Sequence, residues 1–166
     1  MTIELQGEYL ELRPLPEQDL PALLKVYEGT PLYFDGLGQH SPLTLAAVRA
    51  QWQAAQDTPR RELLGVYHRV TDLLIGAADI QIGTPHPTSA AVWLLIWGGF
   101  QRQGYGQDCM ALLEAWLIGG GHAETLCAIA AENAEGISFL ELQGFQRTGE
   151  PATPPIGSGN AFWMCW

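Results

Sequence analysis

The residues best suited to chemistry gather in one short segment, Gln101-Arg102-Gln103-Gly104-Tyr105-Gly106. The segment follows an apolar run and precedes a helical pattern, so unpaired backbone N–H groups and the positive end of a helix dipole converge on it. Gly104 and Gly106 lack side chains, which lets an anion approach the main chain closely. The segment is therefore predicted to bind a pyrophosphate. From these glycines alone, a structural loop without a ligand is the alternative interpretation.

Two other phosphate motifs fit less well. A P-loop requires Gly-Lys-Ser/Thr, but Tyr105 follows Gly104 and Gln107 follows Gly106. A dinucleotide fingerprint needs a third glycine where this chain has Cys109. The sequence excludes a P-loop and supports a dinucleotide fingerprint only weakly.

The elements before this segment follow from hydrophobic periodicity. Residues 8–13 alternate as in a strand, and residues 19–28 place their leucines on one helical face. A second helix is expected over residues 42–56, with Ser41 as its N-cap and Pro42 at its first position. Between the two helices lies a connection rich in glycine, proline and aromatic residues.

The rest of the chain alternates between strand and helix patterns. Three apolar runs before the glycine segment predict an antiparallel meander, over residues 63–69, 73–82 and 90–97. After the segment we expect a helix over 107–118, a strand over 125–131, a helix over 134–143 and a strand over 161–166. This order predicts an α/β (α+β) fold with a mixed sheet, helices on its faces and one parallel crossover.

Length and composition fit one domain over residues 1–166, with 47% hydrophobic residues for a single core. No apolar stretch reaches the ~20 residues that span a bilayer, so no membrane association is expected. The first residues lack the basic and apolar regions of a secretory signal, and we expect a cytoplasmic protein.

The net charge and the cysteine and histidine residues limit which partners and metals the chain is expected to bind. Eight basic residues against 18 acidic ones give a net charge of −10, which argues against nucleic-acid binding and suits a cationic acceptor, or serves only solubility. Three cysteines at wide spacing are expected to be reduced thiols in or near the core. Four histidines without close spacing predict no metal site.

Two motifs together resemble the GNAT superfamily of N-acetyltransferases. Gln101, Gly104 and Gly106 match its acetyl-CoA signature, Gln/Arg-x-x-Gly-x-Gly/Ala, and Asn133 precedes Gly144-Phe145 at the usual separation in that family. The element order agrees over essentially the whole chain. The resemblance implies a GNAT-like mixed central sheet of about six or seven strands flanked by helices, and is closest to the branch like the ribosomal-protein N-terminal acetyltransferases.

The resemblance also implies an activity: direct attack of a primary amine, either a protein N-terminus or a small amine, on acetyl-CoA. The backbone of Leu94, Leu95 and Ile96 would contact the pantetheine arm and thioester, with the Leu94 N–H stabilising the oxyanion. The pyrophosphate contacts would be Gln101, Arg102, Gln103, Gly104, Tyr105 and Gly106. Asn133 would contact the cofactor arm, cap a helix, or do both.

The chain departs from the family at the acid and the base. Leu140 stands where many members have the tyrosine that protonates the departing thiolate, and Ala90 where some have a glutamate base. Ser138 is a tentative replacement donor, or else an ordinary exposed serine. Asp79 is a tentative base, because an acid inside an apolar run either lines the acceptor cleft or faces solvent.

Other assignments stay open at this point. The connection between the first two helices could shape the acceptor pocket through Glu28, Tyr33, Asp35 and His40, or these could be solvated loop residues. The missing acid and base favour a rival function, an acyl-CoA-binding module without turnover. A partner-binding domain that has lost its cofactor is a third hypothesis. The aromatic C-terminus, with Phe162, Trp163 and Trp166, could belong to the core or to a homodimer surface.

Overall fold

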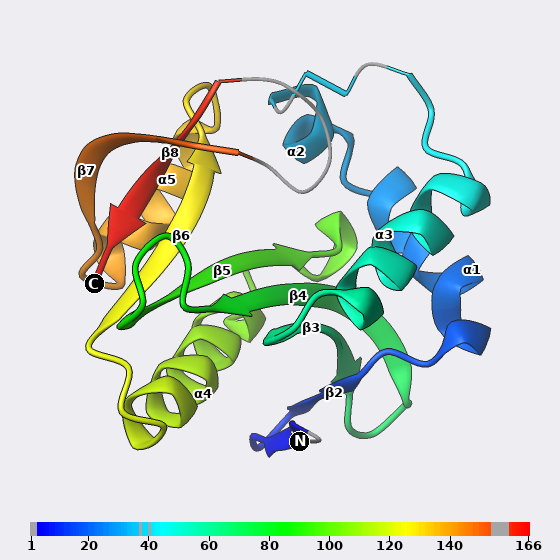
Figure 1. The fold of residues 1–166 in the computed structure, drawn as a ribbon. Helices are drawn as coiled ribbons and strands as arrows, with labels where there is room; N and C mark the ends of the chain where they lie inside the picture. The colour runs from blue at the N-terminus through cyan, green and yellow to red at the C-terminus, as the bar shows by residue number, and fades with distance from the viewer. Residues whose placement is uncertain (1–2, 37, 40, 154–159) are drawn as a thin grey trace.

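The computed structural model describes residues 3–36, 38–39, 41–153 and 160–166. They form an eight-stranded mixed sheet with helices on both faces (Figure 1). The strands are β1 (Leu5–Gln6), β2 (Leu10–Pro14), β3 (Arg61–His68), β4 (Leu73–Ile82), β5 (Ser89–Ile96), β6 (Glu124–Ala130), β7 (Gln146–Ala152) and β8 (Ala161–Cys165). The helices are α1 (Leu20–Glu28), α2 (Pro31–Gly36), α3 (Leu45–Asp57), α4 (Tyr105–Gly119) and α5 (Ala134–Leu142), with short 3-10 turns η1 (Glu17–Asp19) and η2 (Gly98–Phe100).

The sheet order is β1-β2-β3-β4-β5-β6-β8-β7. Strands β3 to β5 form the expected antiparallel meander, β2 pairs antiparallel with β3, and α4 connects β5 to a parallel β6. The mixed α/β class is confirmed, while the count of six or seven strands is too low. Strand β1 has two residues, and β7 contains Gly149 and Pro151. Such segments carry too weak an alternation to be predicted as strands.

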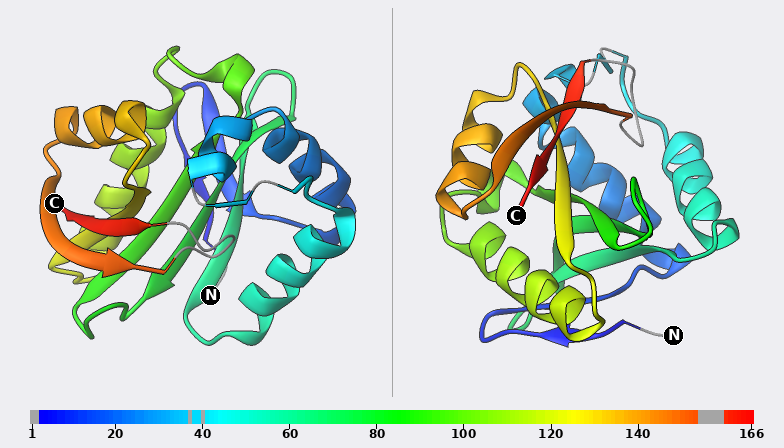
Figure 2. Two further views of the ribbon diagram at one scale, coloured as in Figure 1. Left: turned by 90° about the horizontal axis from the view of Figure 1, so that it is seen from above. Right: turned by 60° about the vertical axis from the view of Figure 1, so that its left-hand side comes forward.

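The two faces of the sheet bury separate apolar clusters. Helices α4 and α5 cover one face, while α1 and α3 cover the other (Figure 2). Alternate side chains of β4 divide between them: Ile75 and Ile80 point toward α4, whereas Leu74 and Ala77 point toward α1 and α3. The side chains alternate with a period of two, which the β-bulge opposite Val66 and Tyr67 shifts by one residue, so Ile75 shares a face with Ile80.

The α1–α3 segment differs from the prediction at two points. Helix α3 begins at Leu45, because the Thr44 hydroxyl and not that of Ser41 accepts a hydrogen bond from the Ala47 N–H. The aromatic-rich connection contains a further short helix, α2, which the periodicity did not indicate. The connection between α1 and α3 therefore contains the helix α2 and extends to Thr44.

The structure also bears on the expected state of the cysteines and on the expected lack of a membrane-spanning helix. Cys109 and Cys127 are buried free thiols, as predicted, and Cys165 is partly exposed. Among the described residues no helix is long and apolar enough to cross a membrane.

Candidate functional site

Strands β5 and β6 are paired for only part of their length. Their parallel pairing runs from Ser89 with Glu124 to Val92 with Cys127 and ends there. Beyond that point β5 continues beside β4 alone, and β6 continues beside β8 alone. The strands diverge visibly in Figure 1. The divergence leaves one edge of residues 93–96 without a neighbouring strand.

The direction of the β5 backbone groups follows from two hydrogen bonds to its other neighbour. The Gly83 N–H donates to the Ser89 carbonyl, and the Trp97 N–H donates to the Ile75 carbonyl. In an antiparallel pair the groups that face the partner belong to alternate residues. Odd-numbered residues of β5, Leu95 included, therefore direct their peptide groups to β4. Leu94 and Ile96 direct theirs into the gap.

The glycine segment closes the wide end of this gap. The Gln101 side chain donates from Nε2 to the Ile96 carbonyl over 2.8 Å, which ties the turn to the free edge of β5. Arg102 and Gly104 have positive φ angles of 60° and 89°, and Gly104 is the N-cap of α4. The left-handed conformation at Gly104 is one that glycine adopts without strain.

The turn presents a row of unpaired backbone donors. No described residue accepts a hydrogen bond from the N–H groups of residues 102–107, and the first bond of α4 runs from the Asp108 N–H to the Gly104 carbonyl. These donors lie at the positive end of a fifteen-residue helix. The exposed Arg102 guanidinium adds a positive charge and pairs with Glu135 of α5 at 2.8 Å. The segment has the composition of an anion site.

Helix α5 forms the far wall of the gap. Asn133 is its N-cap, and the Asn133 side chain accepts a hydrogen bond from the Gly136 N–H over 2.9 Å. A β-carbon at Gly106 would lie 3.3 Å from Phe139 of α5, so the absence of a side chain there lets α4 and α5 approach each other. The cap confirms one of the two roles expected for Asn133.

The positions of the missing acid and base lie in the core. Leu140 is 5% exposed and Ala90 is completely buried. Ser138 lies on α5 with an exposed side chain, and no described residue hydrogen-bonds to it. The structure therefore brings none of these three side chains together with an ionisable partner.

Asp79 is buried and paired, so the expectation that it could face solvent is wrong. It lies on the α1 and α3 face of β4, opposite Trp93 of β5. Arg61 donates to both carboxylate oxygens, from Nε over 2.9 Å and from Nη2 over 2.6 Å. The hydrogen bond to Asp79 is the main cause that raises the pKa of Arg61. The bidentate pair neutralises the charge of Asp79.

The connection between α1 and α3 lies over the same face. Tyr33 of α2 is partly buried there, while Glu28 and Asp35 are exposed. His40 falls outside the described residues. Close packing fixes the connection to the end of β5, because Gly29 lies against the Trp97 indole and the Thr30 hydroxyl accepts from the Gly98 N–H over 3.3 Å.

Tyr105 packs among aromatic rings and has no hydrogen-bonding role among the described residues. Its ring centroid lies 6.0 Å from that of Phe100 and 5.9 Å from that of His68. Phe100 in turn lies 5.8 Å from Trp97. These ring contacts pack the first residue of α4, Tyr105, against η2 and β3.

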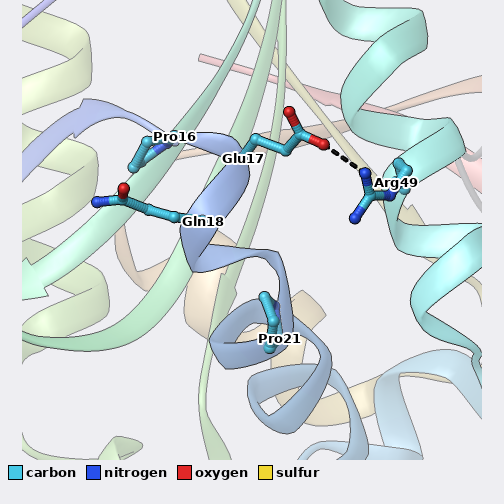
Figure 3. A pocket seen from close by; sticks show the side chains of 5 residues that line it. All are labelled: Pro16, Glu17, Gln18, Pro21 and Arg49. Atoms are coloured by element: carbon cyan, nitrogen blue, oxygen red, sulfur yellow. Dashed lines mark hydrogen bonds and ion pairs between the residues drawn. The ribbon is translucent and has the colours of Figure 1, made fainter.

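A pocket elsewhere on the molecule carries no comparable chemistry. It lies between α1 and α3 (Figure 3), where Glu17 and Arg49 form an ion pair. Its lining is Pro16, Glu17, Gln18, Pro21 and Arg49. None of these belongs to β5, β6 or the glycine turn. Within the described residues, no group of three or more histidine, cysteine, aspartate or glutamate side chains could hold a metal ion.

Comparison with known proteins identifies the fold. No protein-family model and no curated protein matches the chain. Among solved structures, an acetyltransferase from Thermus thermophilus has a TM-score of 0.79 and 24% identity, with 99% of each chain covered. A GCN5-related N-acetyltransferase from Brucella melitensis has a TM-score of 0.80 and 16% identity, over 99% of this chain and 78% of the other. RimL, a ribosomal alpha-N-protein acetyltransferase, has a TM-score of 0.77 and 16% identity, over 100% of this chain and 94% of the other. The chain has the fold of the GNAT acetyltransferases, as its motifs predicted.

Proposed function

From this acetyltransferase fold we propose that the protein transfers the acetyl group of acetyl-CoA to a primary amine. The observation that carries the proposal is the early end of pairing at Val92 and Cys127, beside a turn of unpaired N–H groups. The open edge suits an extended amide-containing arm, and the turn suits a pyrophosphate at its end. The residues present therefore fit acetyl-CoA.

Each part of the cofactor has candidate partners in this chain. The amides of residues 102–107 and the Arg102 guanidinium would hold the pyrophosphate. The backbone of Leu94 and Ile96 would hydrogen-bond the pantetheine arm, and Asn133 would contact it from the α5 side. Leu95 directs its backbone to β4 and buries its side chain in the α1–α3 core cluster, so the backbone contact expected of Leu95 is not part of the proposal. Acetyl-CoA supplies an activated thioester in this position.

The Leu94 N–H is the proposed donor to the thioester carbonyl. It points into the gap two residues beyond the last paired residue, Val92. A backbone donor fixed by the sheet needs no reorganisation as negative charge develops on the carbonyl oxygen. The strand would thus provide the electrostatic part of catalysis through its main chain.

The amine acceptor would approach from the α1 and α3 face. Trp93 and Trp163 line that face, with ring centroids 5.9 Å apart, and Ala91 and Ala128 lie in the same cluster. The acceptor would be a small amine or a peptide N-terminus. Asp79 and Ser138 are the candidate catalytic side chains, and Arg61 holds both oxygens of Asp79.

A thiol-release assay tests the proposal. Acetyl-CoA would be incubated with a panel that contains peptides with free N-termini, polyamines, amino acids and aminoglycosides, and free CoA would be measured with a thiol reagent. We expect release above the amine-free rate with at least one class, and an acetylated product of the corresponding mass. A protein that binds acetyl-CoA but releases no thiol with any amine would contradict acetyl transfer.

That negative result would favour the second candidate, an acyl-CoA-binding module without turnover. The observation behind this alternative is the burial of Leu140 and Ala90 at the family's acid and base positions. Calorimetric titration with acetyl-CoA distinguishes it from a domain that has lost its cofactor, because only the latter gives no heat of binding.

A further inference from the structure

Tyr33 occupies a particular place relative to the gap between β5 and β6. Its ring packs against the cluster that contains Ala77 of β4 and Leu95 of β5, and also against Ala130 of β6 and Ala161 of β8. Tyr33 therefore lies between the α1–α3 core cluster and the β6–β8 side of the divergence. Close backbone packing fixes this position, since a β-carbon at Gly36 of the same helix would lie 3.2 Å from that of Ala130.

Tyr33 lies in an environment that disfavours its ionisation. Burial raises the pKa of Tyr33 above its ordinary value, and Asp79 and Cys127 raise it further. Asp79 lies opposite Trp93 of β5, and Cys127 lies opposite Val92 at the last paired position. Tyr33 packs against the cluster of Ala130 and Ala161, and Ala130 lies three residues beyond Cys127 along β6. Leu94 lies two residues beyond Val92 along β5, so the Tyr33 ring lies beside the gap at the level of the Leu94 N–H proposed above for the thioester.

This hydroxyl is also unengaged, in contrast to that of its neighbour Tyr27. The Tyr27 hydroxyl donates to Gln51 over 2.9 Å. No described residue forms a hydrogen bond with the Tyr33 hydroxyl, whose ring makes an edge contact with Phe34 at 5.1 Å. A partly buried hydroxyl without a partner can both accept and donate one hydrogen bond to a ligand.

We propose that the Tyr33 hydroxyl relays a proton from the attacking amine to the departing thiol. The inference rests on the proposed acetyl transfer. The amine nitrogen bonds to the acetyl carbon and the carbon–sulfur bond breaks. Tyr33 Oη accepts one proton from the nitrogen and gives its own proton to the sulfur. The products are an amide and a thiol, and the tyrosine ends neutral.

The relay explains how the site can function with Leu140 and Ala90 at the acid and base positions. Nitrogen and sulfur are bonded to the same carbon in the tetrahedral intermediate, so one hydroxyl can reach both. The raised pKa of Tyr33 disfavours a phenolate. A concerted exchange avoids that phenolate, because Tyr33 gains and loses a proton together.

Tyr33→Phe tests the relay, with Tyr27→Phe as the matched control. Phenylalanine keeps the ring and removes only the hydroxyl. We expect Tyr33→Phe to lower kcat by about 10²-fold, the usual scale for a proton-transfer group, with acetyl-CoA affinity by calorimetry unchanged. Tyr27→Phe removes a hydroxyl bonded to Gln51 and should leave kcat near the wild-type value.

Several results would overturn the relay. They are a Tyr33→Phe enzyme with near wild-type kcat, a loss of acetyl-CoA affinity that accounts for its defect, or an equal defect in Tyr27→Phe. A proton inventory on the wild-type single turnover needs no variant: two protons in flight give a curved plot, and a linear plot contradicts the relay. A wild-type protein without thiol release overturns acetyl transfer itself, whereas an active wild type with an active Tyr33→Phe variant overturns the relay alone.

Discussion

The Gln101 side chain and the Ile96 carbonyl are joined by a hydrogen bond of 2.8 Å between Nε2 and O. Ile96 is the last residue of β5, and its carbonyl would otherwise have no partner on the open edge. The first position of the glycine segment thus acts through its contact with the strand. It holds the glycine turn at a fixed distance from the proposed thioester-binding edge.

Gln101→Ala should weaken acetyl-CoA binding by about tenfold, or ~1.4 kcal/mol. The variant leaves the Ile96 carbonyl without its donor and frees the turn to move. Calorimetric titration measures the change. Gln103→Ala is the control, because Gln103 donates to Gly99 within the exposed turn. Equal losses in the two variants would show that the bond to β5 has no special importance.

Gly104→Ala should destabilise the turn through its backbone. At a φ of 89°, alanine incurs a left-handed penalty of about 1–2 kcal/mol. The penalty is purely conformational, because a β-carbon at Gly104 would meet no atom within 4 Å. We expect a lower free energy of unfolding in urea and weaker acetyl-CoA binding. Gly99→Ala also adds a methyl in open space but without a positive φ, and should change neither quantity.

Asp79→Asn should destabilise the protein by about 3–5 kcal/mol, because it leaves the Arg61 charge buried without a counter-charge. The Arg61 and Asp79 side chains are 16% and 6% exposed. The double variant Arg61→Met/Asp79→Leu removes both charges and should be more stable than Asp79→Asn in urea unfolding. Glu141→Gln breaks the exposed pair with Arg147 and should have little effect.

The same double variant tests Asp79 as a base. Since Arg61 binds both carboxylate oxygens, we expect the folded double variant to keep its acetyl transfer rate within about tenfold of wild type. A loss of about 10²-fold or more at unchanged acetyl-CoA affinity would assign Asp79 a catalytic role.

The free energy of unfolding should fall above about pH 9 because of two buried thiols. Burial raises the pKa of Cys109 and Cys127 above the ordinary value of 9.0. Above that pH the thiols ionise in the unfolded chain but stay protonated in the folded one. This ionisation stabilises the unfolded state and lowers the free energy of unfolding. The loss approaches about 1.4 kcal/mol per thiol for each further pH unit. Urea unfolding between about pH 8 and pH 10 measures it, and Cys109→Ala should give a shallower slope. An unchanged slope in that variant would exclude Cys109 as a source.

Elements with a long apolar run or a clear periodicity could be predicted from sequence, and short or exposed elements could not. The strand predicted over residues 73–82 coincides with β4, because its run of apolar side chains is buried on both faces. Helix α2 and strand β7 were missed. The six residues of α2 are too few for a helical pattern, and β7 is exposed along nearly its whole length, so burial imposed no alternation on it.

The sequence alone determined the glycine turn, since Gly104 and Gly106 permit a local backbone conformation that neighbouring letters reveal. It also determined that Leu140 and Ala90 replace the family's acid and base. Only the tertiary structure decided which peptide groups of β5 face the gap, because that depends on where pairing with β6 ends at Val92. It also decided that Arg61 neutralises Asp79 and that Tyr33 packs against both the α1–α3 core cluster and the cluster of Ala130 and Ala161. Such contacts join residues far apart in the chain, and no local pattern of letters encodes them.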